Sequence, residues 1–172
     1  MNVSLTGFMG AGKTSTGRSL ARLLRLPFVD VDAEIQRRHG TISAIFEQQG
    51  EAVFRLYESA VIAECAASGP RVIAVGGGAV TSEDNRRHLR VNGVIVYLAV
   101  SPETAFRRVV RRQHRPLLGS QPDLGTVRRL LEEREAAYAD NDLTIHVDRK
   151  TPAIAAKIIA RWYGDRIKQP VR

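Results

Sequence analysis

The amino-acid sequence predicts an α/β fold, a three-layer α/β/α sandwich around a five-stranded parallel sheet. Three observations lead to this prediction. Five short apolar or β-branched runs recur along the chain, segments with apolar residues every three or four positions follow them, and 172 residues suit one ordinary domain. Strand followed by helix, repeated in this way, is typical of a parallel sheet that helices cover on both faces.

The predicted strands are the short runs rich in Val, Ile and other apolar residues. They cover residues 2–6, 27–31, 71–75, 94–100 and 143–147. The predicted helices cover residues 13–26, 32–38, 51–68, 83–91, 102–112, 124–139 and 152–163. Ligands of such sheets bind beyond the carboxyl ends of the strands, so we expect the chemistry in the loops that follow the strands.

We expect residues 1–172 to form a single domain, because no repeat, low-complexity tract or second apolar unit interrupts them. Two stretches lack a regular pattern. One holds Arg-Pro at 115–116 and Gly-Ser-Gln-Pro at 119–122, and it predicts a mobile lid over about 111–124. The other is the end of the chain, residues 165–172, where we expect a frayed tail.

Charge and composition narrow the classes of partner. The chain has 26 Lys and Arg against 18 Asp and Glu, a net charge of +8 that favours anionic ligands. Aromatic residues make up only 6%, which leaves few platforms for base stacking and tilts the choice toward small anions. One cysteine, Cys65, excludes a disulfide within the chain and a cysteine metal cluster.

No apolar run approaches the roughly 18 residues of a membrane span, and the N-terminus has no secretory leader. We therefore expect a cytoplasmic protein without membrane contact.

Residues 7–14, Gly-Phe-Met-Gly-Ala-Gly-Lys-Thr, match the phosphate-binding pattern G-x-x-x-x-G-K-[ST] without a gap. The match follows the first predicted strand and precedes the first predicted helix, where backbone N–H groups and a helix N-terminus would hold phosphate oxygens. Lys13 would reach the β- and γ-phosphates, and the Thr14 hydroxyl would hold Mg²⁺. A chance match is the alternative, which the strand and helix on either side make less plausible.

Asp30 and Asp32 end the second predicted strand. If the strand continues through both, residues two apart point the same way and present both carboxylates to the nucleotide. One could support Mg²⁺ through its water shell, and the other could hold an acceptor hydroxyl. Alternatively the pair is the acidic start of the next helix, with Asp32 as its N-cap.

Further blocks follow in a fixed order: Ile-Ser-Ala-Ile-Phe at 42–46, Gly-Glu-Ala-Val-Phe-Arg-Leu-Tyr-Glu at 50–58, Gly-Gly-Gly-Ala-Val at 76–80, Arg-Pro-Leu-Leu at 115–118 and Glu-Arg-Glu-Ala-Ala-Tyr at 133–138. Together with the phosphate-binding motif at residues 7–14, called the cradle below, and with Asp30 and Asp32, these blocks make the chain resemble the shikimate kinases, a family of P-loop metabolite kinases. The resemblance covers nearly the whole chain and implies a P-loop NTPase fold like that of nucleoside monophosphate kinases. It also implies transfer of the γ-phosphate of ATP to the 3-hydroxyl of shikimate, giving shikimate 3-phosphate and ADP in aromatic amino acid biosynthesis.

The resemblance assigns the acceptor acid to residues outside the cradle. Asp32 would bind the ring hydroxyls and accept the proton of the attacking one. Arg55 and Arg134 would clamp the carboxylate, which planar guanidinium groups match in bidentate fashion. Gly77 and Gly78 would offer backbone donors.

The resemblance also completes the phosphate side. Arg115 on the lid would approach the transferring phosphate and act with Lys13 and Asp32 in catalysis, and Asp30 would join Thr14 at Mg²⁺ through water. The implied ATP-binding residues are Gly10, Ala11, Gly12, Lys13, Thr14, Ser15, Arg108, Arg115 and Pro152. The expected partners are ATP and shikimate, with no nucleic acid, and the expected state is a monomer.

Other interpretations remain open on the sequence. Arg55 with Glu58 reads equally as a solvated i,i+3 pair, and Arg134 as part of a charged helix face. The same fold could serve a gluconate-type or other small-acid kinase, or a nucleotide kinase. A basic P-loop module that binds nucleic acid is a non-enzymatic alternative, although the basic residues are dispersed and no nucleic-acid motif occurs.

Overall fold

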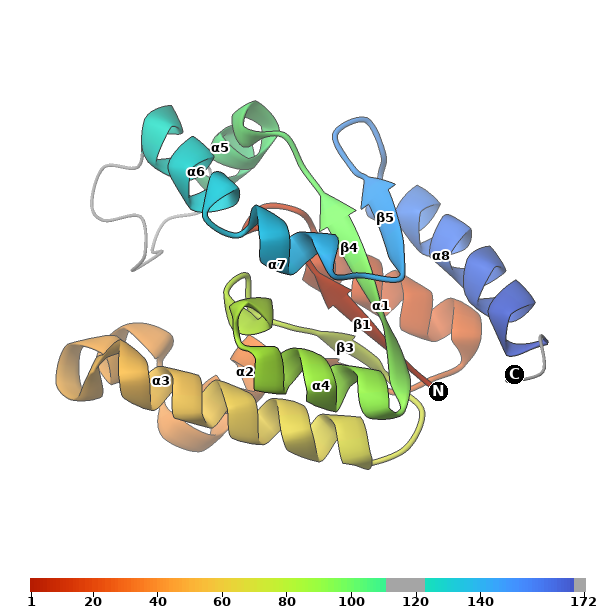
Figure 1. Cartoon of the computed structure of the whole chain (residues 1–172), viewed down its shortest axis with the longest axis horizontal. Coiled ribbons are helices and arrows are strands. Elements are labelled where there is room, and N and C mark those ends of the chain that lie inside the picture. The colour runs from red at the N-terminus through yellow and green to blue at the C-terminus, as the bar shows by residue number, and fades with distance from the viewer. Residues whose placement is uncertain (111–122, 169–172) are drawn as a thin grey trace.

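The computed structural model describes residues 1–110 and 123–168. Its centre is a five-stranded, all-parallel sheet in the order β2-β3-β1-β4-β5. The strands are β1 (Asn2–Thr6), β2 (Phe28–Asp30), β3 (Val72–Ala74), β4 (Gly93–Ala99) and β5 (Leu143–His146). The predicted five-stranded parallel sheet is confirmed, and each strand lies within a few residues of its predicted range (Figure 1).

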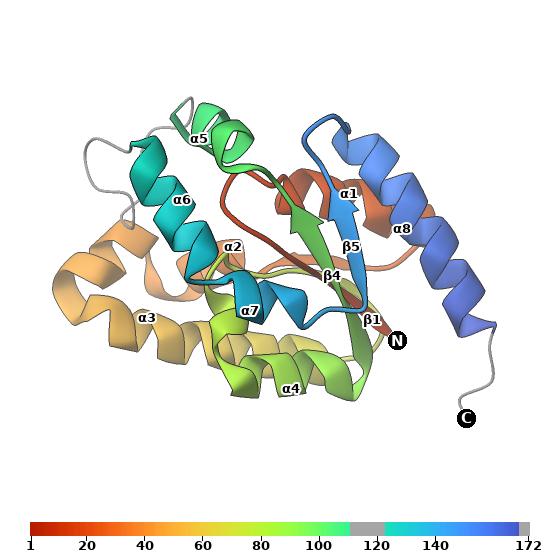
Figure 2. The same ribbon diagram turned by 45° about the horizontal axis from the view of Figure 1, so that its top comes forward.

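Helices cover both faces of the sheet (Figures 1 and 2). One face packs on α1 (Lys13–Leu24) and α8 (Pro152–Ile167), and the other on α3 (Ile42–Ala67) and α4 (Glu83–Val91). The remaining elements are α2 (Val31–His39), the 3₁₀ helix η1 (Ala79–Thr81), α5 (Pro102–Val110), α6 (Leu124–Glu132) and α7 (Glu135–Ala139).

Strand β4 shows why the chain forms three layers. Its apolar run alternates between two separate cores: Val94, Val96 and Leu98 join the core beneath α1 and α8. Ile95 and Tyr97 join the core beneath α3 and α4. Because successive residues of a strand point to opposite faces, a continuous apolar run is the pattern that a sheet covered on both sides requires.

Two predicted helices differ from the structure. The helix expected from residue 51 does follow Gly50, but another helical segment precedes it, since α3 starts at Ile42 with Thr41 as N-cap and kinks at Gly50, where φ is 83°. The helix expected over 124–139 is divided, because α6 ends at Glu132 and α7 begins at Glu135. Arg134 lies in that break.

The two irregular stretches have different outcomes. Helix α8 continues to Ile167, so residues 165–167 of the expected frayed tail are helical. Residues 111–122 of the expected lid lie outside the described residues. Across residues 1–110 and 123–168, no helix is both long and apolar enough to cross a membrane.

Candidate active site

A pocket of about 1100 Å³ opens where the loops leave the carboxyl ends of the strands. It is lined by the loop after β1, the end of β2, the glycines after β3 and the turn before α8. This is the location that the parallel sheet predicts. Its lining includes two groups of residues, the phosphate-binding motif and the set Arg55, Glu58 and Arg134.

The loop after β1 has the backbone of an anion cradle. Gly7, Gly10 and Gly12 have φ values of 138°, 84° and 88°, a region that residues with a side chain rarely adopt. Helix α1 follows at once, without a side-chain N-cap and without an acidic residue in its first turn. Its N-terminal N–H groups and the positive end of its dipole therefore face the pocket without a carboxylate of the first turn to compete for them.

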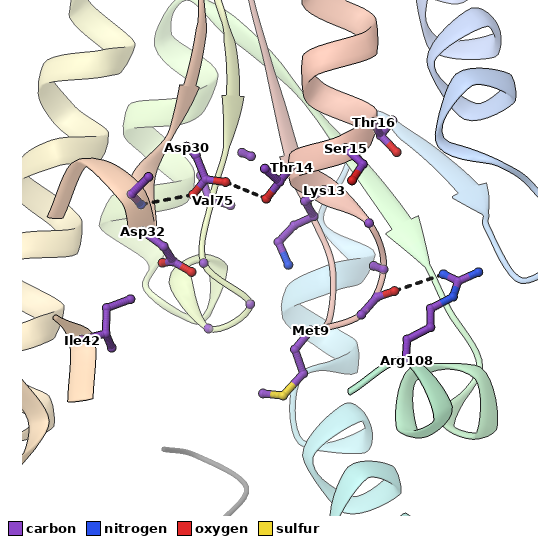
Figure 3. Close-up of a pocket in the computed structure, with 18 of the residues that line it drawn as sticks. Met9, Lys13, Thr14, Ser15, Thr16, Asp30, Asp32, Ile42, Val75 and Arg108 are labelled. Carbon is purple, nitrogen blue, oxygen red and sulfur yellow. Dashed lines mark hydrogen bonds between the residues drawn. The ribbon is translucent and has the colours of Figure 1, made fainter. Parts of the chain in front are cut away.

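The two polar residues that end the motif lie in this cradle. The Lys13 ammonium donates to the carbonyl oxygens of Gly7 at 2.6 Å and Phe8 at 3.2 Å, so it lies across the loop. The Thr14 hydroxyl donates to Asp30 Oδ2 at 2.6 Å, which links α1 to the end of β2 (Figure 3).

Asp30 and Asp32 both line the pocket, but not for the predicted reason. Strand β2 ends at Asp30, and the chain turns into α2 at Val31, so the two carboxylates do not share a strand face. The N-cap of α2 is Asp30, which accepts from Ala33 N at 3.3 Å, and not Asp32. Figure 3 shows Asp30 beside Thr14 and Asp32 farther along the pocket, beside the glycine turn.

The Thr14 and Asp30 pair suits a magnesium ion that phosphate groups also hold. Both side chains supply hard oxygen atoms, and they already meet at 2.6 Å. Among residues 1–110 and 123–168, no cluster of three or more His, Cys, Asp or Glu could form a cage for a metal. Mg²⁺ in phosphate-transfer sites needs few protein ligands, because the substrate and water complete its shell.

Arg55 enters the pocket from α3 and is held by two carboxylates. Its Nη1 donates to Glu58 Oε2 at 2.7 Å, and its Nη2 to Glu51 Oε1 at 2.8 Å. The Glu58 residue is 0% exposed, so the interpretation of Arg55 and Glu58 as a solvated pair is wrong. Burial raises the pKa of Glu58, against the charge and hydrogen bond of Arg55, which lower it.

Glu58 is a site residue that the sequence reasoning missed. Its Oε2 fixes Arg55, while its Oε1 has no hydrogen-bond partner among the described residues. The available signal was its position three residues after Arg55, which places both side chains on one face of α3. That spacing does not distinguish a buried pair from an exposed one.

Arg134 lies at the break between α6 and α7 and is only 8% exposed. The alternative that it belongs to a solvated helix face is therefore wrong. Its guanidinium carbon lies 5.8 Å from the centre of the Phe8 ring, and its Nη1 has no hydrogen-bond partner among the described residues. A buried guanidinium with an unused donor is costly to maintain unless an anion completes it.

The three glycines after β3 bring the backbone against these charged groups. A Cβ atom at Gly76 would lie 2.3 Å from Glu58 Oε1, and one at Gly78 would lie 2.7 Å from Arg55 Nη2. A side chain at either position would therefore push against a charged group that lines the pocket.

On the nucleotide side, Arg108 joins three elements. From α5 it donates to Gly10 O at 3.1 Å (Figure 3) and to Val147 O, also at 3.1 Å. Gly10, Ala11, Gly12, Lys13, Thr14, Ser15, Arg108 and Pro152 all line the same pocket. Arg115 lies outside the described residues. The structure thus brings together every predicted site residue that it describes.

Comparison with known proteins identifies the relatives of this chain. A family model described as shikimate kinase matches residues 9–163. The shikimate kinase of Thiobacillus denitrificans is 43% identical over 160 residues, which cover 92% of this chain and 87% of that protein. That of Bordetella pertussis is 45% identical over 137 residues, 79% of this chain and 65% of its own length. The chain thus spans slightly less than two thirds of the Bordetella relative.

Solved structures agree with these matches. A shikimate kinase from Acinetobacter baumannii in complex with shikimate superimposes with a TM-score of 0.92 at 37% identity, over 98% of this chain and 95% of that one. A gluconokinase from Sinorhizobium meliloti superimposes with a TM-score of 0.63 at 17% identity, over 99% of this chain and 97% of that one. The second likeness shows the shared fold alone.

Proposed function

The chain belongs to the shikimate kinase family, and we propose on that basis that it transfers the γ-phosphate of ATP to the 3-hydroxyl of shikimate. The products are shikimate 3-phosphate and ADP. The observation that carries this proposal is the pairing, in one pocket, of a phosphate cradle with the buried guanidinium of Arg134 and its unused donor.

The cradle would bind the triphosphate mainly through the backbone. Glycines with positive φ let N–H groups turn inward, and the N-terminus of α1 adds its dipole. Lys13 now donates to two carbonyl groups of the same loop. A phosphate within its reach offers a stronger, charged acceptor, so the ammonium would turn toward the β- and γ-phosphates.

Mg²⁺ would supply charge neutralisation at the phosphates, and Thr14 would hold it, with Asp30 acting through water. The support is the hydrogen bond between these two side chains and the oxygen chemistry of both. Asp30 also caps α2, so a movement of its carboxylate is restrained.

The acid would lie at the far end of the pocket, between Arg55 and Arg134. Two guanidinium groups that approach from different elements fix the orientation of a carboxylate as well as its position. Gly77 and Gly78 would meet the ring hydroxyls with backbone groups. Asp32, beside Gly76, would hold the attacking hydroxyl and accept its proton, and Arg115 would approach the transferring phosphate.

We propose further that residues 1–172 act as one domain and as a monomer in the cytoplasm. The step would serve aromatic amino acid biosynthesis through chorismate.

An acceptor screen tests the substrate. A coupled assay for ADP release should be run with shikimate, gluconate and nucleoside monophosphates at matched concentrations. We expect preference for shikimate over gluconate because of the family to which the chain belongs, and over nucleoside monophosphates because two arginines and a glycine turn suit a polyhydroxy acid. Preference for gluconate or a monophosphate would overturn the assignment, and filter binding to DNA and RNA tests the non-enzymatic alternative in parallel.

A further inference from the structure

Tyr138 is a buried aromatic residue at which two parts of the acid end of the pocket meet. It lies on α7, is 1% exposed, and stacks on Tyr97 of β4 with ring centres 4.8 Å apart. Its hydroxyl donates to the carbonyl oxygen of Gly77 at 2.5 Å. A side chain from α7 thus holds the glycine turn that follows β3, although 61 residues separate the two positions.

The same hydroxyl lies next to Arg134. The pKa of Tyr138 rises to about 12 because burial disfavours the phenolate, although the charge and hydrogen bonding of Arg134 act in the opposite direction. The backbone N–H of Tyr138 also donates to the Arg134 carbonyl at 2.9 Å. Because the phenol stays protonated, its proton remains available to Gly77 while its oxygen faces the guanidinium.

Peptide geometry gives the bond to Gly77 a consequence for the pocket. The carbonyl of Gly77 and the N–H of Gly78 belong to one planar trans peptide, in which the two groups point in opposite directions. When Tyr138 holds that carbonyl, it also sets the direction of the Gly78 N–H. Gly77 lies against Arg134 as well, since a Cβ atom there would be 3.7 Å from Arg134 Nη1.

We propose that Tyr138 is a positioning residue that fixes the glycine turn and Arg134 relative to each other. It does not reach the pocket itself, because it is absent from the residues that line it. Its hydroxyl sets the distance between the backbone donors for the hydroxyl groups of the acid and the guanidinium for its carboxylate. This inference rests on the proposed function, since it names what aligns the acid that Arg134 would bind.

The test is Tyr138→Phe, which keeps the ring stacked on Tyr97 and removes only the hydroxyl. Tyr163→Phe is the matched control: the Tyr163 hydroxyl donates to Met1 O at 2.6 Å, an equivalent bond from α8 far from the pocket. We expect Tyr138→Phe to raise the KM for shikimate about tenfold, the loss of one well-placed hydrogen bond beside a charged group. The KM for ATP should stay within about twofold of wild type.

A purely structural role would predict otherwise. It would give Tyr138→Phe and Tyr163→Phe similar losses of thermal stability and no change in the KM for shikimate, and that result overturns the inference.

A double-mutant cycle with Arg134→Lys adds a second measurement. We expect the effects of the two substitutions on the KM for shikimate to be non-additive, because Tyr138 acts through Arg134, and strict additivity contradicts this.

The wild-type assay separates this inference from the proposed function. If wild-type protein does not phosphorylate shikimate, the proposed function itself is wrong. If wild type is active and Tyr138→Phe matches Tyr163→Phe in KM, only the role of Tyr138 is refuted.

Discussion

The two ends of the pocket are built in different ways. The nucleotide end is one uninterrupted stretch, residues 7–14, and it acts largely through backbone N–H groups and a helix terminus. The acid end combines side chains from α3 and from the break before α7 with the backbone of the glycine loop after β3. Its central groups, Glu58 and Arg134, are 0% and 8% exposed.

This difference has a physical consequence. A backbone cradle depends on glycine φ values and tolerates changes in most neighbouring side chains. A cluster of buried charges depends on each member, because removing one leaves another without its partner. We therefore expect the side chain of Lys13 to have the largest effect on turnover at the nucleotide end, and several side chains at the acid end to affect the affinity for the acid.

The largest effect is expected at Lys13. Lys13→Ala should lower kcat by about a thousandfold, because the Lys13 ammonium lies across the loop that would hold the γ-phosphate, whereas Arg108 is held by the carbonyl oxygens of Gly10 and Val147. Steady-state ADP release measures it. Lys157→Ala, an exposed lysine on α8, is the control and should match wild type. Activity of Lys13→Ala within a few-fold of wild type would show that the cradle has been misassigned.

The next largest effect is expected at Arg134. Arg134→Ala should raise the KM for shikimate roughly a hundredfold, the usual cost of losing a buried charged hydrogen bond, while the KM for ATP is retained. Arg129→Ala is matched to it, since Arg129 lies on α6 with 66% of its side chain exposed. If the affinity for ATP fell instead, Arg134 would belong to the nucleotide end.

A smaller effect is expected from Glu58→Gln. This change keeps the volume and removes the buried charge that fixes Arg55, so the KM for shikimate should rise about tenfold. Glu51→Gln is an informative control, because Glu51 binds the same guanidinium at 2.8 Å but leaves 52% of its side chain exposed. Equal effects of the two substitutions would mean that burial of Glu58 has no part in holding Arg55.

The smallest effect concerns stability in alkaline solution. Burial raises the pKa of Tyr138 from 10.0 to about 12. The part of the unfolding free energy that depends on protonated Tyr138 is therefore fully present below pH 10 and is lost as the pH rises through 12. Between pH 9 and 11, wild type should lose roughly 1 kcal/mol of unfolding free energy more than Tyr138→Phe. Urea unfolding at several pH values measures this, and parallel curves for the two proteins would contradict it.

The same contrast explains what the sequence could predict. The cradle and the sheet depend on local patterns, so residues 7–14 and all five strands were predicted close to their observed positions. Asp30 and Asp32 were predicted to line the nucleotide crevice, but from a strand that in fact ends at Asp30. The error came from period-two reasoning at an element boundary, where the helix start takes over.

The acid end depends on burial and tertiary contacts, which spacing does not encode. Arg55 with Glu58 and the run around Arg134 read as ordinary charged helix faces, and only the resemblance to a family singled out the arginines. The break at Arg134 was missed because the charged run 132–135 continues a helical pattern. Glu58 was missed because burial of a carboxylate depends on the glycine turn that packs against it.

The most direct test of the division between nucleotide end and acid end is calorimetric titration. Wild type, Lys13→Ala and Arg134→Ala would each be titrated with Mg·ADP and, separately, with shikimate. We predict that wild type binds both ligands, and that Arg134→Ala loses affinity for shikimate but keeps its affinity for Mg·ADP. Lys13→Ala should retain its affinity for shikimate. Folded wild-type protein that takes up no Mg·ADP, or an Arg134→Ala variant that binds shikimate as tightly as wild type, would contradict the division.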